Sequence, residues 1–149
     1  MHVSADYPDP LRPDKPKAFS NLVEVAQDCV HRVISINRLT AVTGNIEALP
    51  FADAGGTDHQ AVVYPALPRG LRFRQSLQRL AAWIVQDCRR RSFVPDLVHA
   101  HKLTVEGTVG QLVAQELGVP LAVSIQGKTD AELTTRAFWL RALFQSVWR

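Results

Sequence analysis

Two histidines stand two residues apart in residues 97–101, which read LVHAH. Side chains alternate across a strand, so His99 and His101 would share one face of it. Three interpretations stay open for the pair: hydrogen-bonded structural histidines, ligands of a metal, or a catalytic group beside a structural one. A metal site needs three or four converging ligands. The other histidines, at positions 2, 31 and 59, have no helpful spacing, so we expect no metal.

Lysines and a glycine follow other apolar runs. Lys15 and Lys17 belong to a proline-rich stretch after the first apolar residues, and Gly127 and Lys128 follow the run LAVSI. Lysine can neutralise a phosphate as a point charge, and glycine lets a ligand approach the backbone closely. An exposed charged loop and a plain turn are the simpler alternatives. We predict that these four residues bind substrate.

Residues 95–130 predict the unit that would position several of these groups. An apolar strand ends at His101, Thr104 is a plausible N-cap, and Gly118 with Pro120 would end the helix before a second strand at 121–125. A strand, a helix and a strand in about thirty residues form a βαβ unit with parallel strands. Ligands of such sheets bind beyond the carboxyl ends of the strands, where residues 101–103 and 126–128 would lie.

The rest of the chain continues the alternation of strands and helices. Helices are expected from about Ser20, over 71–91 and from about Leu133 to Val147, and strands at 1–5, 31–36 and 61–64, the last closed by Pro65. Residues 39–58 are expected to form a loop, because they contain Gly44, Pro50 and a Gly-Gly pair. This pattern predicts an α/β, Rossmann-like fold with a mostly parallel sheet and helices on both faces.

Composition narrows the class of protein. The chain has 149 residues and a net charge of +3, which does not by itself indicate a nucleic-acid partner. Its two cysteines form no CxxC motif, which favours a reducing, cytoplasmic setting. No apolar run approaches the ~20 residues of a membrane span. The dinucleotide fingerprint, the Walker motif and the nucleophile elbow are absent from the sequence.

Four segments carry a resemblance to a known family: DLVHAH at 96–101, Glu106-Gly107, GVPLAV at 118–123 and Gln126-Gly127. They resemble the N-terminal domain of family-4 glycosyltransferases of the GT-B type, which usually show histidine where this chain has Gln126. The resemblance implies a nucleotide-diphosphate sugar as donor, a glycan or lipid-linked acceptor, no metal cofactor and no nucleic acid. It also implies that His101 reaches the donor sugar and acts in catalysis, while His99 is mostly structural.

The same resemblance implies a division of labour between two domains. We expect residues 1–149 to form one Rossmann-like domain, a fragment that lacks the C-terminal nucleotide-sugar domain and is inactive alone. The rival hypotheses are a non-catalytic binding domain on the same scaffold and another nucleotide-binding Rossmann-like domain.

A last feature concerns location: Arg72, Arg79, Trp83 and Arg90 would form one stripe of a helix. This stripe is either a solvated basic face or a peripheral contact with an anionic inner membrane surface.

Overall fold

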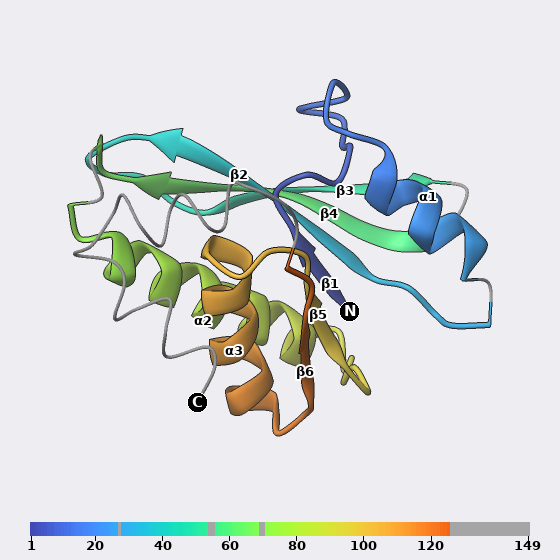
Figure 1. Cartoon of the computed structure of the whole chain (residues 1–149). Helices are drawn as coiled ribbons and strands as arrows, with labels where there is room; N and C mark the ends of the chain where they lie inside the picture. Colours follow the sequence, from blue (N-terminus) through green and yellow to red (C-terminus); the bar gives the residue numbers. More distant parts are fainter. Residues whose placement is uncertain (27, 54–55, 69–70, 126–149) are drawn as a thin grey trace. The chain divides into compact units, whose positions relative to one another are not determined.

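The computed structural model describes residues 1–26, 28–53, 56–68 and 71–125. The chain divides into two compact units, Met1–Leu71 and Arg72–Arg149 (Figure 1). Each unit combines strands with helices, and each is described by itself below. The predicted last helix lies outside the described residues.

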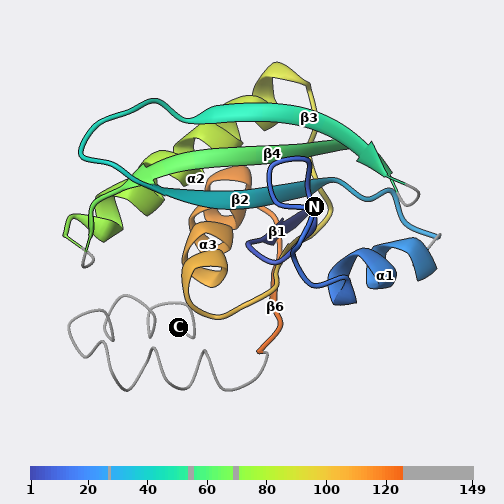
Figure 2. The same ribbon diagram turned by 90° about the horizontal axis from the view of Figure 1, so that it is seen from above.

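The first unit is built on four strands and one helix: β1 (His2–Ser4), α1 (Ala18–Val25), β2 (Val33–Thr40), β3 (Glu47–Asp53) and β4 (Gly56–Ala66). Strands β1 and β2 are parallel, as are β2 and β4, while β3 runs antiparallel to β4. Figure 2 shows β3, β4 and β2 side by side. Ser4 at the end of β1 pairs with Ser35, so β2 continues past the carboxyl end of β1.

The prediction of a loop at residues 39–58 is wrong. Strand β2 extends to Thr40, β3 occupies Glu47–Asp53, and β4 begins at Gly56 and passes through Pro65. Pro50 misled the expectation, although proline is tolerated in a strand that pairs on one side only. The Gly-Gly pair misled it too, since glycine is also typical of the turn between two antiparallel strands. Asp53 of β3 is paired with Gly56 of β4.

The core of the first unit joins α1 to the strands. Phe19 and Val23 lie four residues apart, hence on one helix face, and pack with Tyr7 and Val33 in a cluster that Phe51 borders. Each of these large side chains contributes about 1.5–3 kcal/mol by leaving water. This packing places the segment that joins β1 to α1 against the sheet.

The second unit confirms the predicted βαβ segment. Among its described residues the elements are α2 (Phe73–Arg90), β5 (Val98–Ala100), α3 (Val105–Leu117) and β6 (Leu121–Val123), with β5 and β6 parallel (Figure 1). Helix α3 ends at Leu117, and the φ of 69° at the following Gly118 is a left-handed conformation that glycine adopts without strain. A Cβ atom at Gly110 would lie 3.1 Å from the Cβ of Ala100 and 3.1 Å from a methyl of Leu121. Glycine at that position therefore lets α3 approach both strands.

These pairings confirm the predicted fold class, an α/β, Rossmann-like architecture with mostly parallel strands. Helix α2 buries Leu77, Leu80 and Ile84 along one face, as the helical spacing predicted. The predicted basic stripe needs one correction. Arg72 precedes the helix with a left-handed φ of 50°, so it does not continue the helical spacing of Arg79 and Arg90.

Candidate functional site

A buried carboxylate organises the loop that follows β1. Oδ1 of Asp9 accepts hydrogen bonds from the backbone N–H groups of Leu11 and Arg12, at 2.8 and 2.9 Å. Its Oδ2 lies 2.7 Å from Nζ of Lys15 and 3.0 Å from Nδ2 of Asn37. The hydroxyl of Ser35 completes the group at 2.6 Å from the same oxygen. Both carboxylate oxygens are thus satisfied, although the side chain is fully buried.

The surroundings keep this carboxylate ionised. Burial of Asp9 would by itself raise its pKa, but hydrogen bonds from Lys15, Ser35 and Asn37 outweigh burial and hold the pKa below the ordinary 3.8. A charged group this deep needs such partners, because an unpaired buried charge is strongly destabilising. The cluster links the loop to β2, since Ser35 and Asn37 both belong to that strand.

The two predicted lysines of the loop lie in different environments. Lys15 directs its ammonium inward, 2.7 Å from Asp9 and 2.9 Å from the hydroxyl of Ser35, with 7% of its side chain exposed. Lys17 is exposed and immediately precedes α1. The interpretation of both as exposed loop charges is therefore wrong for Lys15. Substrate binding by either lysine stays a prediction.

A pocket of about 450 Å³ opens beside this loop in the first unit. The ring of Tyr7, itself buried, and the half-buried ring of Phe51 supply apolar walls, with ring centroids 6.4 Å apart. Polar groups of α1 and of the residue before it lie on the rim. The remaining lining residues come from the loop and from this helix: Pro8, Asp9, Pro10, Pro13, Lys17, Ser20, Asn21 and Glu24. Rings beside hydroxyl, amide, ammonium and carboxylate groups make a surface suited to a polyhydroxylated ligand.

The histidine pair lies in the second unit. His99 is on β5 and His101 just follows it, with the two rings stacked at 4.4 Å between centroids. Nε2 of His99 lies 2.7 Å from the hydroxyl of Ser124, just beyond β6. Burial lowers the pKa of His99 below its ordinary 6.5, which favours the neutral ring. His101 is fully buried. Its catalytic role stays a prediction, as does the structural role of His99.

Part of the predicted site cannot be placed. Gly127 and Lys128 lie outside the described residues. Conversely, the sequence-based prediction missed Asp9, Tyr7 and Phe51. An Asp-Pro dipeptide at 9–10 marks a turn, and this signal could have drawn attention to Asp9. Nothing local in the sequence indicates its contacts with β2.

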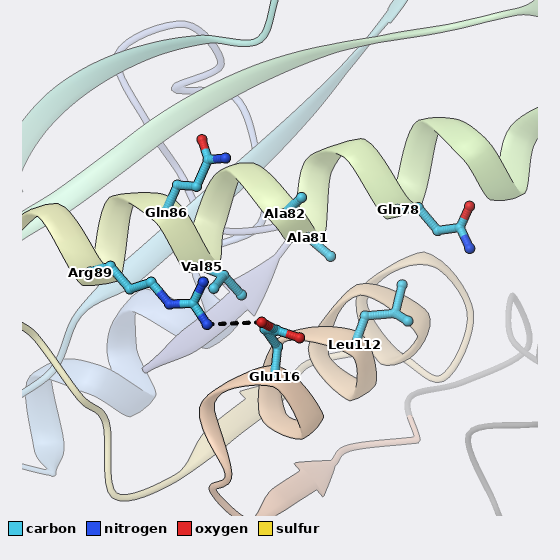
Figure 3. Close-up of a pocket in the computed structure, with 8 residues that line it drawn as sticks. All are labelled: Gln78, Ala81, Ala82, Val85, Gln86, Arg89, Leu112 and Glu116. Atoms are coloured by element: carbon cyan, nitrogen blue, oxygen red, sulfur yellow. Dashed lines mark hydrogen bonds and ion pairs between the residues drawn. The ribbon is translucent and has the colours of Figure 1, made fainter.

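A second hollow, of about 330 Å³, lies between α2 and α3 of the second unit. Figure 3 shows Arg89 of α2 and Glu116 of α3 meeting across it, with nitrogen and oxygen 2.8 Å apart. Ala81, Ala82 and Leu112 supply small and apolar lining. The exposed ion pair contributes little to stability, since surface pairs are worth about 0–1 kcal/mol. None of the predicted site residues that the structure describes lines this groove.

The predicted membrane-facing residues on α2 differ in their exposure. Arg79 and Arg90 are exposed, and Trp83 is half-buried. Arg90 directs Nη2 to Oδ1 of Asp87 at 3.3 Å, which offsets part of its charge. In the described segments, no helix has the length and apolar character needed to cross a membrane.

Parallel strands with a loop-lined pocket beyond β1 are typical of α/β proteins, a class whose ligands usually bind past the strand ends. Residues 18–149 match a family model described as a glycosyl transferase 4-like domain. The chain belongs to this family.

One curated relative supports the same class. The chain is 28% identical over 64 residues to the putative teichuronic acid biosynthesis glycosyltransferase TuaC of Bacillus subtilis (strain 168). The alignment covers 43% of this chain and 16% of the relative, so the chain spans only a small part of that protein's length. No solved structure matches the chain.

Proposed function

We propose that this chain is the acceptor-side domain of a glycosyltransferase that uses a nucleotide-diphosphate sugar as donor. The observation that carries the proposal is the family match over residues 18–149. In this proposal the chain works with a second domain that holds most of the nucleotide, and the sugar passes to a glycan or lipid-linked acceptor between the two. The relative's name, which refers to teichuronic acid biosynthesis, is in keeping with a glycan product.

The pocket beside the β1–α1 loop is the proposed acceptor site. The half-buried Phe51 would pack against the C–H face of a sugar ring, since aromatic rings bury apolar surface at low entropic cost. Asn21 and Glu24 on α1 would accept or donate hydrogen bonds to hydroxyl groups. Lys17 at the rim would meet an anionic group of the acceptor or donor. We therefore propose a saccharide, rather than a protein side chain, as the group recognised here.

His101 is the proposed catalytic residue, acting at the donor sugar. Transfer leaves negative charge on the departing diphosphate, and that charge must be stabilised by positioned donors. We propose that Gly127, through its backbone N–H, and Lys128 supply such donors in this chain. No step in this scheme requires a metal or another cofactor.

The test compares the chain alone with a protein that contains both domains. Release of nucleotide diphosphate is measured from a panel of sugar nucleotides, with and without oligosaccharide acceptors. We expect acceptor-dependent release only from the two-domain protein. Acceptor-dependent turnover by the 149-residue chain alone would overturn the proposal that two domains are needed. If neither protein shows turnover, the transferase assignment is overturned.

The proposed location is the cytoplasm, with peripheral attachment to an anionic inner membrane surface. Arg79 and Arg90 are exposed on α2, and Trp83 combines an apolar ring with a polar N–H. Such a contact would hold the enzyme near a lipid-linked acceptor. The attachment would be weak and sensitive to salt, because screening acts over about 8 Å at physiological ionic strength.

A further inference from the structure

We infer that Asp9 is a positioning residue. The hydrogen bonds of its buried carboxylate, called the lock below, hold the β1–α1 loop against β2 and so shape the pocket beside that loop. The inference rests on the proposed function only for what the pocket binds. Asp9 lines the pocket, yet its side chain has no exposed surface, so it cannot itself bind a ligand through that side chain. It acts through the residues that it holds.

The first part of the lock is local. Oδ1 accepts the N–H groups of Leu11 and Arg12, and the N–H of Arg12 also points to the carbonyl oxygen of Asp9 at 3.0 Å. This arrangement, in which an aspartate accepts backbone N–H groups two and three residues ahead, closes a tight turn. The turn fixes the direction of the chain between the prolines at 8, 10 and 13.

The second part is long-range. Oδ2 receives the Lys15 ammonium and the Asn37 amide, and the Ser35 hydroxyl lies 2.6 Å away. The same hydroxyl lies 2.8 Å from the carbonyl oxygen of Tyr7, so the backbone of this pocket residue belongs to the same network. Lys15 is therefore committed to the lock, and its neighbour Lys17 is the lysine that reaches the pocket rim.

Only an ionised aspartate fits this set of partners. Both oxygens face N–H donors, and an ammonium has no acceptor to offer. In Asp9→Asn the amide nitrogen would face either the two backbone N–H groups or the Lys15 ammonium, whichever way the side chain is turned. The substitution keeps the size of the side chain and removes its function, and so it is a sharp test of the lock.

The first measurement uses the unaltered chain. Trace acetylation with limiting acetic anhydride, followed by peptide mass spectrometry, gives the relative reactivity of each lysine. We expect Lys15 to react at least roughly tenfold more slowly than Lys17, because its amine must first leave a charge-assisted hydrogen bond. Equal reactivity of Lys15 and Lys17 would overturn the lock, and no variant needs to fold for this result.

The second measurement compares Asp9→Asn with Asp14→Asn, the matched control. Asp14 lies in the same loop but forms an exposed ion pair with Arg12. We expect Asp9→Asn to accelerate amide exchange at Leu11 and Arg12 by roughly tenfold or more, while the amides of β2 and β4 stay protected. We expect Asp14→Asn to leave the exchange rates of Leu11 and Arg12 unchanged. Lys15→Met serves as a second variant if Asp9→Asn does not fold. Unchanged exchange in a folded Asp9→Asn chain would overturn the inference.

A third measurement separates the lock from the proposed acceptor site. Methyl β-D-glucopyranoside is titrated into labelled chain and followed by NMR at Asn21, Glu24 and Phe51. We expect Asp9→Asn to weaken this binding while Asp14→Asn does not. No binding to the unaltered chain would overturn the acceptor assignment, whereas the acetylation and exchange results would still decide the lock.

Discussion

His99 and Ser124, which are 25 residues apart in the sequence, connect two parallel strands, with Nε2 and Oγ at 2.7 Å. Ser124 is just past the end of β6, so the contact fastens the exit of that strand to β5. The neutral ring favoured by burial of His99 can hold this hydrogen bond without bringing a charge into the half-buried site. The connection supports the predicted structural role of His99, and the catalytic role of His101 stays a prediction.

The first prediction concerns the titration of His99. Burial lowers its pKa in the folded chain, so NMR titration of the imidazole should give a midpoint below the ordinary 6.5. In the pH window between the folded and unfolded values the unfolded chain binds more protons. The contribution of neutral His99 to the free energy of unfolding is therefore complete above pH 6.5 and is lost as the pH falls through the pKa of His99 in the folded chain.

Urea denaturation across this window provides the second measurement for His99. The unaltered chain should lose more stability than His99→Gln as pH falls, since glutamine does not titrate. Ser124→Ala is the control, because it keeps the titrating ring and hence the pH dependence. An NMR midpoint at or above 6.5 would contradict the prediction.

The second prediction concerns the close packing of α3. Gly110→Val should destabilise the chain by about 1–3 kcal/mol, because a side chain there overpacks the contact with Ala100 and Leu121. Gln115→Val, at an exposed position of the same helix, should change stability by only a few tenths of a kcal/mol. Chemical denaturation midpoints measure both. Equal effects of the two substitutions would show that Gly110 is not required for packing.

The third prediction separates the two histidines by function. In a protein with both transferase domains, His101→Ala should lower turnover by roughly 10²-fold or more, as expected for a positioned catalytic group. His99→Ala should mainly lower thermal stability. The measurement is steady-state turnover together with a melting curve for each variant. Loss of activity in a stable His99→Ala protein, with His101→Ala unaffected, would reverse the assignment.

The fourth prediction concerns membranes. Two arginines near an anionic surface contribute about 2 kcal/mol, or roughly thirtyfold in partitioning. Arg79→Glu with Arg90→Glu should therefore abolish co-sedimentation with anionic vesicles at low salt. Arg89→Glu is the control for each of the two single substitutions, because Arg89 faces Glu116 at the α2–α3 groove. Equal binding to anionic and neutral vesicles would leave α2 as an ordinary solvated helix.

The βαβ segment could be predicted because its signals are local. The spacing of Val109 and Val113, the glycine at 118 and the proline at 120 each report on one element and agree with one another. Helix α2 was predictable for the same reason, apart from the left-handed residue at its start. Element boundaries elsewhere shifted by a few residues, as at β2, which begins at Val33 and ends at Thr40.

Strand β3 and the Asp9 cluster could not be predicted in the same way, because both depend on distant partners. The strand exists through its pairing with β4, which overrides the local preference of Pro50 for a loop. Asp9 meets Ser35 and Asn37 from 26 and 28 residues away. A lysine in a charged loop is typical of a solvated side chain, and only the fold shows that Lys15 turns inward.

Strand β3 also affects how the isolated chain behaves in concentrated solution. Its far side pairs with no strand among the described residues, and such an edge can recruit another chain into intermolecular sheet and thence into aggregates. Pro50 removes one N–H donor from that edge, and the charged, exposed Glu47 opposes close approach. Pro50, which made the strand hard to predict from the sequence, thus acts against self-association. Replacing Pro50 with valine would therefore favour aggregation through the exposed edge of β3.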